Sequence, residues 1–377
     1  MEHINNIRNH FPILKAGKIY FNHAAIGPLS DLVIRRLNKY IELRSTGEIE
    51  NYPTQLEASK SAKEKLSRMF NTKPDRFSWI DSVSNGMNVL AQGIDWETGD
   101  RIILNDIEFP ANVYPFLNLK KEGVEIDFAK SRNGKVDVED IEKLITPKTK
   151  LVSISLVQFL SGYRTDVVAI SELCKKHNVI FSVDAIQGAG AVQVDIQKSQ
   201  IDFLCVGSHK WLMGLQGSSF FYISEELQER LTQKFVGWLS VVGGWDFTNY
   251  NLVLKSSAER FQNGSLNVIG IVALDESLNL FESIGMESIE RRVLDNTEYF
   301  ISELKGIGAD VLMSSVPRKN LSGIVSVRHD SQKVFDELLK KNIYFSLRMG
   351  ILRFSPHFYN TKEEIDSVVE EIKKVIT

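Results

Sequence analysis

A lysine follows the end of an apolar segment near the middle of the chain. The segment "DFLCVG" (202–207) is typical of a buried strand, and Ser208, His209 and Lys210 come directly after it. An amine at the mouth of a buried strand loses hydration, which lowers its pKa and leaves part of it neutral. A neutral amine attacks carbonyl groups and forms a Schiff base. Lys210 is therefore a candidate nucleophile, and the alternative is a lysine in a solvated loop.

A carboxylate stands near the end of the preceding apolar segment, "VIFSVDA" (179–185). Asp184 must find a donor or a cation there, because an unpaired buried charge is costly. It could face a cationic ring nitrogen, and Gln187 could place an amide over the same cleft. The alternative for Asp184 is an N-cap of the next helix.

A third group of residues follows the segment "FSWID" (77–81). Ser84, Asn85 and Gly86 lie at a predicted helix N-terminus, where unpaired N–H groups and the helix dipole favour phosphate. Simple N-capping by Ser84 is the alternative.

Phe109 follows the next apolar segment and precedes a proline, so its ring could stack on a planar ligand or could belong to the core. Successive strand ends thus offer a phosphate cradle, a stacking ring, an anion and an amine that attacks carbonyls. Pyridoxal phosphate (PLP) is the cofactor that needs all four.

The elements that must position these groups alternate along the chain. Short β-branched segments are separated by stretches of helical period, which predicts an α/β fold with a mostly parallel sheet between helices. Ligands bind beyond the carboxyl ends of such strands. We expect a large PLP-binding domain over 21–255, a smaller C-terminal α+β domain over 256–377, and an N-terminal segment over 1–20 that packs with the small domain.

Composition excludes several classes of protein. The 377 residues are 43% hydrophobic and 25% charged, with a formal net charge of −3, which is ordinary for a globular protein and gives no general attraction to nucleic acid or membranes. Two cysteines, Cys174 and Cys205, form neither a disulfide framework nor a metal-binding spacing. Because the N-terminus lacks the apolar core of a secretion signal, we expect a cytoplasmic protein. The absence of a metal-binding spacing predicts a protein without a metal.

The segment "IDFLCVGSHKWLMGLQGSSFF" (201–221) resembles the lysine motif of the class V aminotransferase family. These fold-type I PLP-dependent enzymes have a seven-stranded sheet in the large domain and include cysteine desulfurases, kynureninases and isopenicillin-N-epimerase-like proteins. The resemblance covers nearly the whole chain, and further matching segments are "IYFNHAAIGPL" (19–29), "IEFPANVYP" (107–115), "SVDAIQGAG" (182–190), "AERFQNGSLN" (258–267) and "LRFSPHFYNTKEEID" (352–366).

The resemblance implies roles for individual residues. Lys210 would hold PLP as an internal aldimine and move the α-proton of the substrate, while Asp184 would pair with the pyridine nitrogen. Gln187 would bond the phenolic oxygen of the ring, Phe109 would stack on it, and Arg353 would bind the substrate α-carboxylate. The phosphate would be held by Ser84, Asn85, Gly86 and Ser208 or His209, and Ser265 would reach the phosphate of a neighbouring subunit. Asn22 and Ala25 would line the substrate entrance. Gln158 would face the substrate or cofactor, and the alternative for Gln158 is a structural amide.

The implied protein is a homodimer with shared active sites that acts on a small amino acid. Cysteine desulfurases that form a persulfide need a thiol in the last third of the chain, and this sequence has no cysteine after Cys205. Amino-group transfer is the first expectation for the reaction. A lyase or epimerase reaction is the alternative within the family, and a non-catalytic binding protein with this fold is the alternative outside it.

Overall fold

A twisted sheet of seven strands forms the centre of the molecule. The computed structural model describes residues 6–47 and 49–376. The strand order is β2-β8-β7-β6-β5-β3-β4, and only β8 runs antiparallel to its neighbours. The strands are β2 (Phe77–Ile80), β3 (Arg101–Asn105), β4 (Glu125–Ala129), β5 (Thr149–Ser155), β6 (Ile180–Asp184), β7 (Phe203–Gly207) and β8 (Ser219–Ile223).

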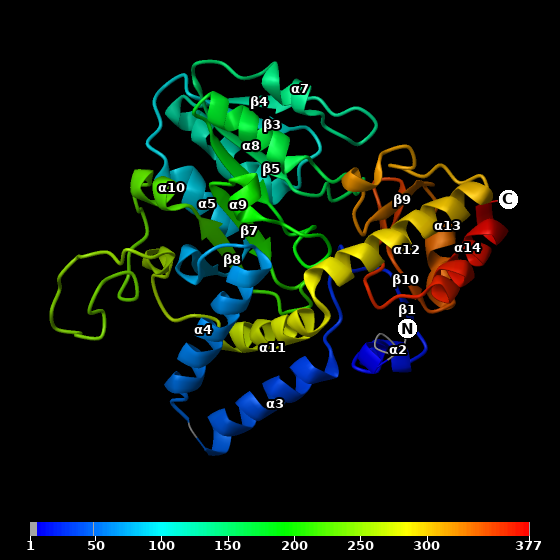
Figure 1. The fold of residues 1–377 in the computed structure, drawn as a ribbon, viewed down its shortest axis with the longest axis horizontal. Helices are drawn as coiled ribbons and strands as arrows, with labels where there is room; N and C mark the ends of the chain where they lie inside the picture. Colours follow the sequence, from blue (N-terminus) through cyan, green and yellow to red (C-terminus); the bar gives the residue numbers. More distant parts are fainter. Residues whose placement is uncertain (1–5, 48, 377) are drawn as a thin grey trace.

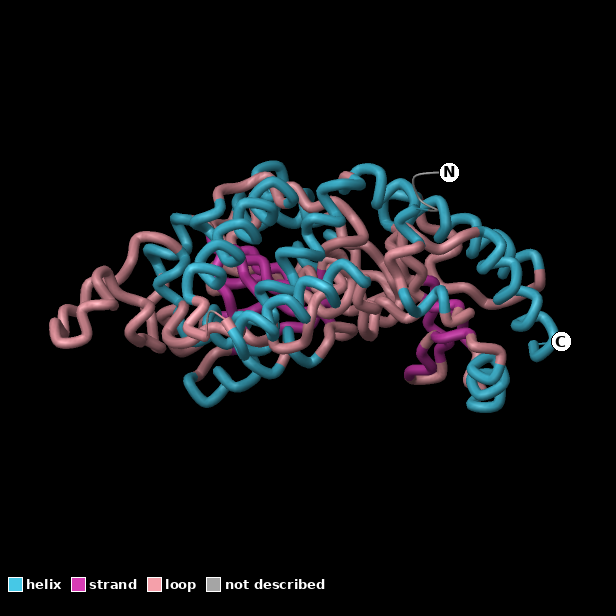
Figure 2. Tube along the Cα trace, turned by 90° about the horizontal axis from the view of Figure 1, so that it is seen from below, coloured by secondary structure: helices cyan, strands magenta, loops and turns pink. Residues whose placement is uncertain are grey.

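The central strands are mostly apolar, and both faces of the sheet are covered. Every residue of β6, β7 and β8 is buried, as expected for strands between two layers of helices. Figure 2 shows the strands inside the molecule with helices on either side. These observations confirm the predicted fold class.

The helices before residue 285 include the one whose N-terminus is predicted to bind phosphate, α5. The longest are α3 (Asp31–Thr46), α4 (Tyr52–Met69), α5 (Val83–Gly93), α8 (Val167–Lys176) and α11 (Val268–Ile284), and short helices are α2 (Pro12–Lys15), α6 (Tyr114–Leu117), α7 (Val138–Glu142), α9 (Ile196–Ser199) and α10 (Glu225–Arg230). Helix α5 begins one residue earlier than predicted. Its N-cap is Ser82, whose Oγ accepts a hydrogen bond from Asn85 N at 3.2 Å, so the alternative of capping by Ser84 is wrong.

A second lobe holds the small sheets (Figure 1). An antiparallel sheet has the order β11-β12-β9, and β1 pairs in parallel with β10. The elements are β1 (Ile19–Tyr20), β9 (Val325–Arg328), β10 (Ile343–Tyr344), β11 (Ser346–Arg348), β12 (Ile351–Phe354), α12 (Met286–Gly306), α13 (Gln332–Lys340) and α14 (Lys362–Ile376).

Packing around α11 bears on where the large domain ends. Helix α11 lies beside α3 and α4, and Lys65 Nζ is 2.6 Å from Asp275 Oδ1 in a buried ion pair between α4 and α11. The predicted boundary at residue 255 stays a prediction, and residues 1–5 of the predicted N-terminal segment lie outside the described residues. No helix of the described residues is both long and apolar enough to cross a membrane.

Candidate active site

Lys210 and Asp184 lie at the carboxyl ends of neighbouring strands. Asp184 is the last residue of β6, and Lys210 follows β7 by three residues. Burial, and then the charge of Glu108, raises the pKa of Asp184 to about 7. Burial also lowers the pKa of Lys210 to about 8, with the charge of Asp184 opposing the shift. The amine is therefore easier to deprotonate than an ordinary lysine, as a Schiff-base lysine requires.

An aromatic ring lies beside this amine. Lys210 Nζ is 5.5 Å from the centroid of the Phe109 ring, and Phe109 meets Phe159 edge-on with ring centroids 5.3 Å apart. The Phe109 side chain is 37% exposed, so it is not a core aromatic residue. A planar cofactor attached to Lys210 would therefore have one of its faces covered by the Phe109 ring.

Arg353 is a buried cation whose guanidinium group is largely unused. Its Nη1 donates to the carbonyl of Phe159 at 2.7 Å, whereas Nε and Nη2 have no partner among the described residues. Burial, and then the charge of Arg348, lowers the pKa of Arg353 to about 9. Buried charges are normally paired, so these two nitrogens mark a place for an anion.

The predicted entrance residues lie close to the strand that carries Arg353. Ser346 is the cross-strand neighbour of Arg353, and its Oγ donates to Asn22 Oδ1 at 2.6 Å. Ala25 follows in the same turn, because its backbone N–H donates to the carbonyl of Asn22 at 3.0 Å. Asn22 thus contacts the strand partner of Arg353, and the substrate contacts of Asn22 and Ala25 stay predictions.

The predicted phosphate cradle is formed by the first turn of α5. Ser84, Asn85 and Gly86 occupy this turn, and the Asn85 amide donates to both oxygens of Asp81 at 2.7 and 2.8 Å. A Cβ atom on Gly86 would lie 2.4 Å from Cys205 Sγ in β7. Gly86 therefore lets the start of the helix approach the strand that leads to Lys210.

The small residues before Lys210 are held inside their own turn. The Ser208 hydroxyl lies 2.9 Å from the carbonyl oxygen of Leu215 and 2.5 Å from that of Ser218. Its single proton is thus engaged. Burial, and then the charge of Lys210, lowers the pKa of His209 to about 4. Contact of Ser208 or His209 with a phosphate stays a prediction.

The two predicted glutamines already have hydrogen-bond partners. Gln187 donates from Nε2 to the carbonyl of Ala24 at 3.0 Å and accepts at Oε1 from Trp211 Nε1 at 2.9 Å. Because Nε2 carries a second N–H, its predicted bond to the phenolic oxygen of the ring requires neither of these bonds to break. Gln158 lies three residues beyond the end of β5, in a turn, and donates from Nε2 to Glu108 Oε1 at 3.2 Å.

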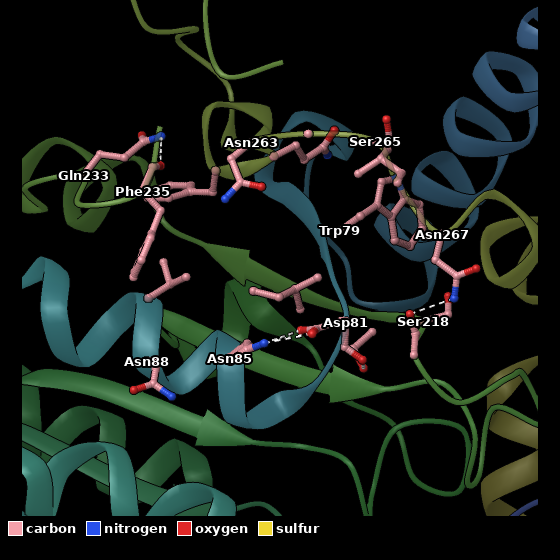
Figure 3. Close-up of a pocket in the computed structure, with 18 of the residues that line it drawn as sticks. Trp79, Asp81, Asn85, Asn88, Ser218, Gln233, Phe235, Asn263, Ser265 and Asn267 are labelled. Carbon is pink, nitrogen blue, oxygen red and sulfur yellow. Dashed lines mark hydrogen bonds between the residues drawn. The ribbon is translucent and has the colours of Figure 1, made fainter. Parts of the chain in front are cut away.

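A cavity of about 480 Å³ lies beside α5 rather than at Lys210. It is lined by Asn85 and Ser265 from the predicted set, together with Trp79, Phe235 and Asn267 (Figure 3). Because Lys210, Asp184 and Arg353 do not line it, we place the reacting atoms elsewhere and leave Ser265 as a predicted contact of a neighbouring subunit.

His23, His357 and Tyr359 form a buried cluster. His23 Nε2 lies 2.7 Å from the Tyr359 hydroxyl and His23 Nδ1 lies 2.9 Å from the carbonyl of Ser355. His357 Nε2 lies 3.0 Å from the carbonyl of Trp211. Burial lowers the pKa of both histidines. These neutral groups join the N-terminal segment to the turn after Lys210.

Known proteins match the chain along nearly its whole length. The chain is 26% identical to a probable cysteine desulfurase of Methanothermobacter thermautotrophicus, over 98% of this chain and 97% of that protein. It is 27% identical to the uncharacterized aminotransferase YcbU of Bacillus subtilis, over 99% and 98%.

Solved structures share the fold. The apo cysteine desulfurase of Thermococcus onnurineus NA1 matches with a TM-score of 0.87 at 22% identity, covering 99% of this chain and 98% of that one. The cystine C-S lyase C-DES, in complex with its reaction product cysteine persulfide, matches with a TM-score of 0.88 at 23% identity, covering 96% and 99%.

The model of one protein family spans almost the whole chain. The aminotransferase class-V model matches residues 19–368, which include every residue predicted for the site. This match confirms the resemblance found in the sequence, and with it an enzyme of the aminotransferase or related lyase type and pyridoxal phosphate as the cofactor. The chain belongs to the aminotransferase class-V family.

Proposed function

We propose that this protein binds PLP at Lys210, acts on a small α-amino acid and catalyses a lyase reaction at the β-carbon of that substrate. The observation that carries the choice of substrate is the buried Arg353 guanidinium, because its unpartnered Nε and Nη2 suit an α-carboxylate. The charge of Arg353 also contributes to lowering the pKa of Lys210.

The residues of the chain fit the cofactor and divide the chemistry between them. Bound PLP supplies an electron sink for the electrons left on the α-carbon. Asp184 would offer its carboxylate to the ring nitrogen, and Phe109, beside Lys210, would cover a face of the ring. A pKa of about 8 leaves about a tenth of the Lys210 amine neutral at pH 7, and this amine can take the α-proton.

A lyase is favoured over a desulfurase that carries sulfur on its own cysteine. The only two cysteines, Cys174 and Cys205, are buried, and burial raises the pKa of both thiols. A thiolate is the form that attacks sulfur, so neither is suited to forming a persulfide. The likeness to a cystine C-S lyase supports elimination from a sulfur-containing substrate.

Amino-group transfer, the first expectation from the sequence, is the second candidate. It is supported by the likeness to YcbU, which is described as an uncharacterized aminotransferase. The two reactions differ in what they consume. A lyase releases ammonia and a keto acid without an acceptor, whereas a transaminase turns over only when a keto acid accepts the amino group.

The separating experiment is a panel of L- and D-amino acids that includes cysteine and cystine. Ammonia, keto acid and sulfide are measured with and without added pyruvate. Continuous release of ammonia without pyruvate is expected. Turnover that depends on pyruvate would replace the lyase assignment by the aminotransferase one. A colourless protein that ignores added PLP would refute both.

We also propose a homodimer in the cytoplasm with active sites shared between subunits. Support comes from the long loop between α10 and α11, which projects from the body of the molecule in Figure 1. It exposes large apolar side chains, namely Phe235, Trp238, Trp245, Phe247, Tyr250 and Leu252. Such aromatic residues are enriched at interfaces. Light scattering that finds a monomer at micromolar concentration would contradict the dimer.

A further inference from the structure

A buried carboxylate outside the predicted site lies one residue before Phe109. Glu108 is 8% exposed, and all five of its hydrogen-bond partners are neutral donors. Oε1 accepts from Asn105 Nδ2 at 2.5 Å, from the Ser155 backbone N–H at 2.7 Å and from Gln158 Nε2 at 3.2 Å. Oε2 accepts from Ser155 Oγ at 2.5 Å and from Asn112 Nδ2 at 3.2 Å.

The orientation of these partners is fixed by other contacts. Asn105 Oδ1 accepts from the Ile107 backbone N–H at 3.1 Å, and Asn112 Oδ1 accepts from Ser153 Oγ at 2.7 Å. Both amides must therefore turn their nitrogens toward Glu108. A carboxyl group surrounded only by donors acts as an acceptor at both oxygens, which is the behaviour of the ionised form.

This arrangement determines the orientation of the Gln158 amide. Its nitrogen is bound to Glu108, and its Oε1 is buried without a partner among the described residues. A flipped amide would set its oxygen against the carboxylate oxygen, two acceptors facing each other. Unpartnered buried acceptors are rare in folded proteins, so the oxygen of Gln158 requires an explanation.

The residue that follows Gln158 contacts the guanidinium group of Arg353. Phe159 follows Gln158 directly, and its carbonyl accepts the bond from Arg353 Nη1 at 2.7 Å. The Oε1 acceptor of Gln158 and the Nε and Nη2 donors of Arg353 thus all lack hydrogen-bond partners among the described residues. An α-amino acid carries the complementary groups, since it has a carboxylate and a hydrogen-bond donor.

We propose that Glu108 is a positioning residue, which turns the Gln158 amide so that its oxygen accepts a hydrogen bond from the substrate while Arg353 binds the carboxylate. The inference rests on the proposed function and adds a specificity determinant to it. A ligand with both groups uses both contacts, whereas acetate, which has the carboxylate alone, uses only Arg353.

The test compares wild type, Glu108→Gln, Gln158→Met and the double variant, each loaded with PLP. Glycine binding is titrated through the visible absorbance of the cofactor, and acetate binding through its competition with glycine. Each single variant should bind glycine about tenfold more weakly, the effect of one lost hydrogen bond. The double variant should bind no more weakly than either single variant, because Glu108 acts through Gln158. Acetate binding should not change.

A matched control removes a different, half-buried carboxylate. Asp202 accepts a hydrogen bond from the Phe181 backbone N–H at 2.9 Å, at the far end of β6 from Asp184. Asp202→Asn should leave glycine binding unchanged. Urea unfolding of each apoprotein reports whether a variant has merely lost stability, which would weaken glycine and acetate binding together.

Two results would overturn the proposal. One is wild-type glycine affinity in Glu108→Gln, and the other is a loss in the double variant equal to the product of the two single losses. If Glu108→Gln does not fold, Gln158→Met decides the matter, because unchanged glycine binding in that variant overturns the proposal and a tenfold loss with intact acetate binding supports it. Failure of the proposed function is recognised separately, as a wild-type protein whose absorbance responds to no amino acid.

Discussion

Replacing Arg353 by methionine should stabilise the apoprotein while it destroys substrate binding. The guanidinium is 1% exposed and two of its three nitrogens lack partners among the described residues. Lowering its pKa from 12.5 to about 9 corresponds to about 5 kcal/mol of lost preference for the charged form. The variant also gives up the bond to the Phe159 carbonyl, worth about 1 kcal/mol.

The net effect should be a gain in the free energy of unfolding. Replacing buried charged groups by apolar ones of similar volume commonly stabilises by about 1–4 kcal/mol, and we expect about 2 kcal/mol for Arg353→Met in the same range. The assay is urea unfolding of the apoproteins at pH 7. Glycine titration of the PLP-loaded variant should show no change in absorbance.

A second arginine provides the control. Arg76 is also buried, at 5% exposure, but its guanidinium donates to Gln228 Oε1 at 3.4 Å and to the carbonyl of Ser256 at 3.2 Å. Arg76→Met should therefore lower stability. If Arg353→Met lowers the stability of the apoprotein as much as Arg76→Met does, the reasoning that Arg353 is an uncompensated charge is refuted.

Three further outcomes follow from the same site. Folding raises the pKa of Asp184 from 3.8 to about 7, so between these pH values the folded state binds more protons than the unfolded state, and the contribution of Asp184 to stability is lost as pH rises through 7. The stability of apo Asp184→Asn relative to wild type, measured by urea unfolding, should therefore increase from pH 4 to pH 7. A difference that stays constant with pH would contradict this. Gly86→Ala should cost about 2 kcal/mol through overpacking against Cys205 Sγ, and thermal unfolding should show recovery when Cys205→Ala is added. Arg348→Ala removes a charge that lowers the pKa of Lys210, so the pH dependence of the reaction of PLP with the apoprotein should move to higher pH, and an unchanged profile would exclude that influence.

The groups at strand ends could be predicted because they depend on local signals. Lys210 and Asp184 follow apolar segments that can only be buried strands, and parallel neighbours end at one edge of a sheet. Phe109 was placed by the same rule. Arg353 came from the resemblance, since nothing in its own segment indicates that the guanidinium would be left without partners.

The sequence alone does not predict the contacts between segments that are far apart in the chain. The cluster of His23, His357 and Tyr359 joins residues more than 330 positions apart at its longest link. The five donors around Glu108 come from the ends of β3 and β5 and from the segments that follow these strands, and only the assembled sheet brings them together. Ser82 and Ser84 both suit the N-cap of helix α5, and the structure has Ser82 in that position.

The most direct test of the account asks which lysine carries the cofactor. The PLP-loaded protein is reduced with borohydride and digested, and the peptides are mapped by mass spectrometry. We predict a single modified residue, Lys210, and no modified peptide from Lys210→Ala treated in the same way. A stable adduct at another lysine, or none in a protein that binds PLP, would contradict the assignment of the active site.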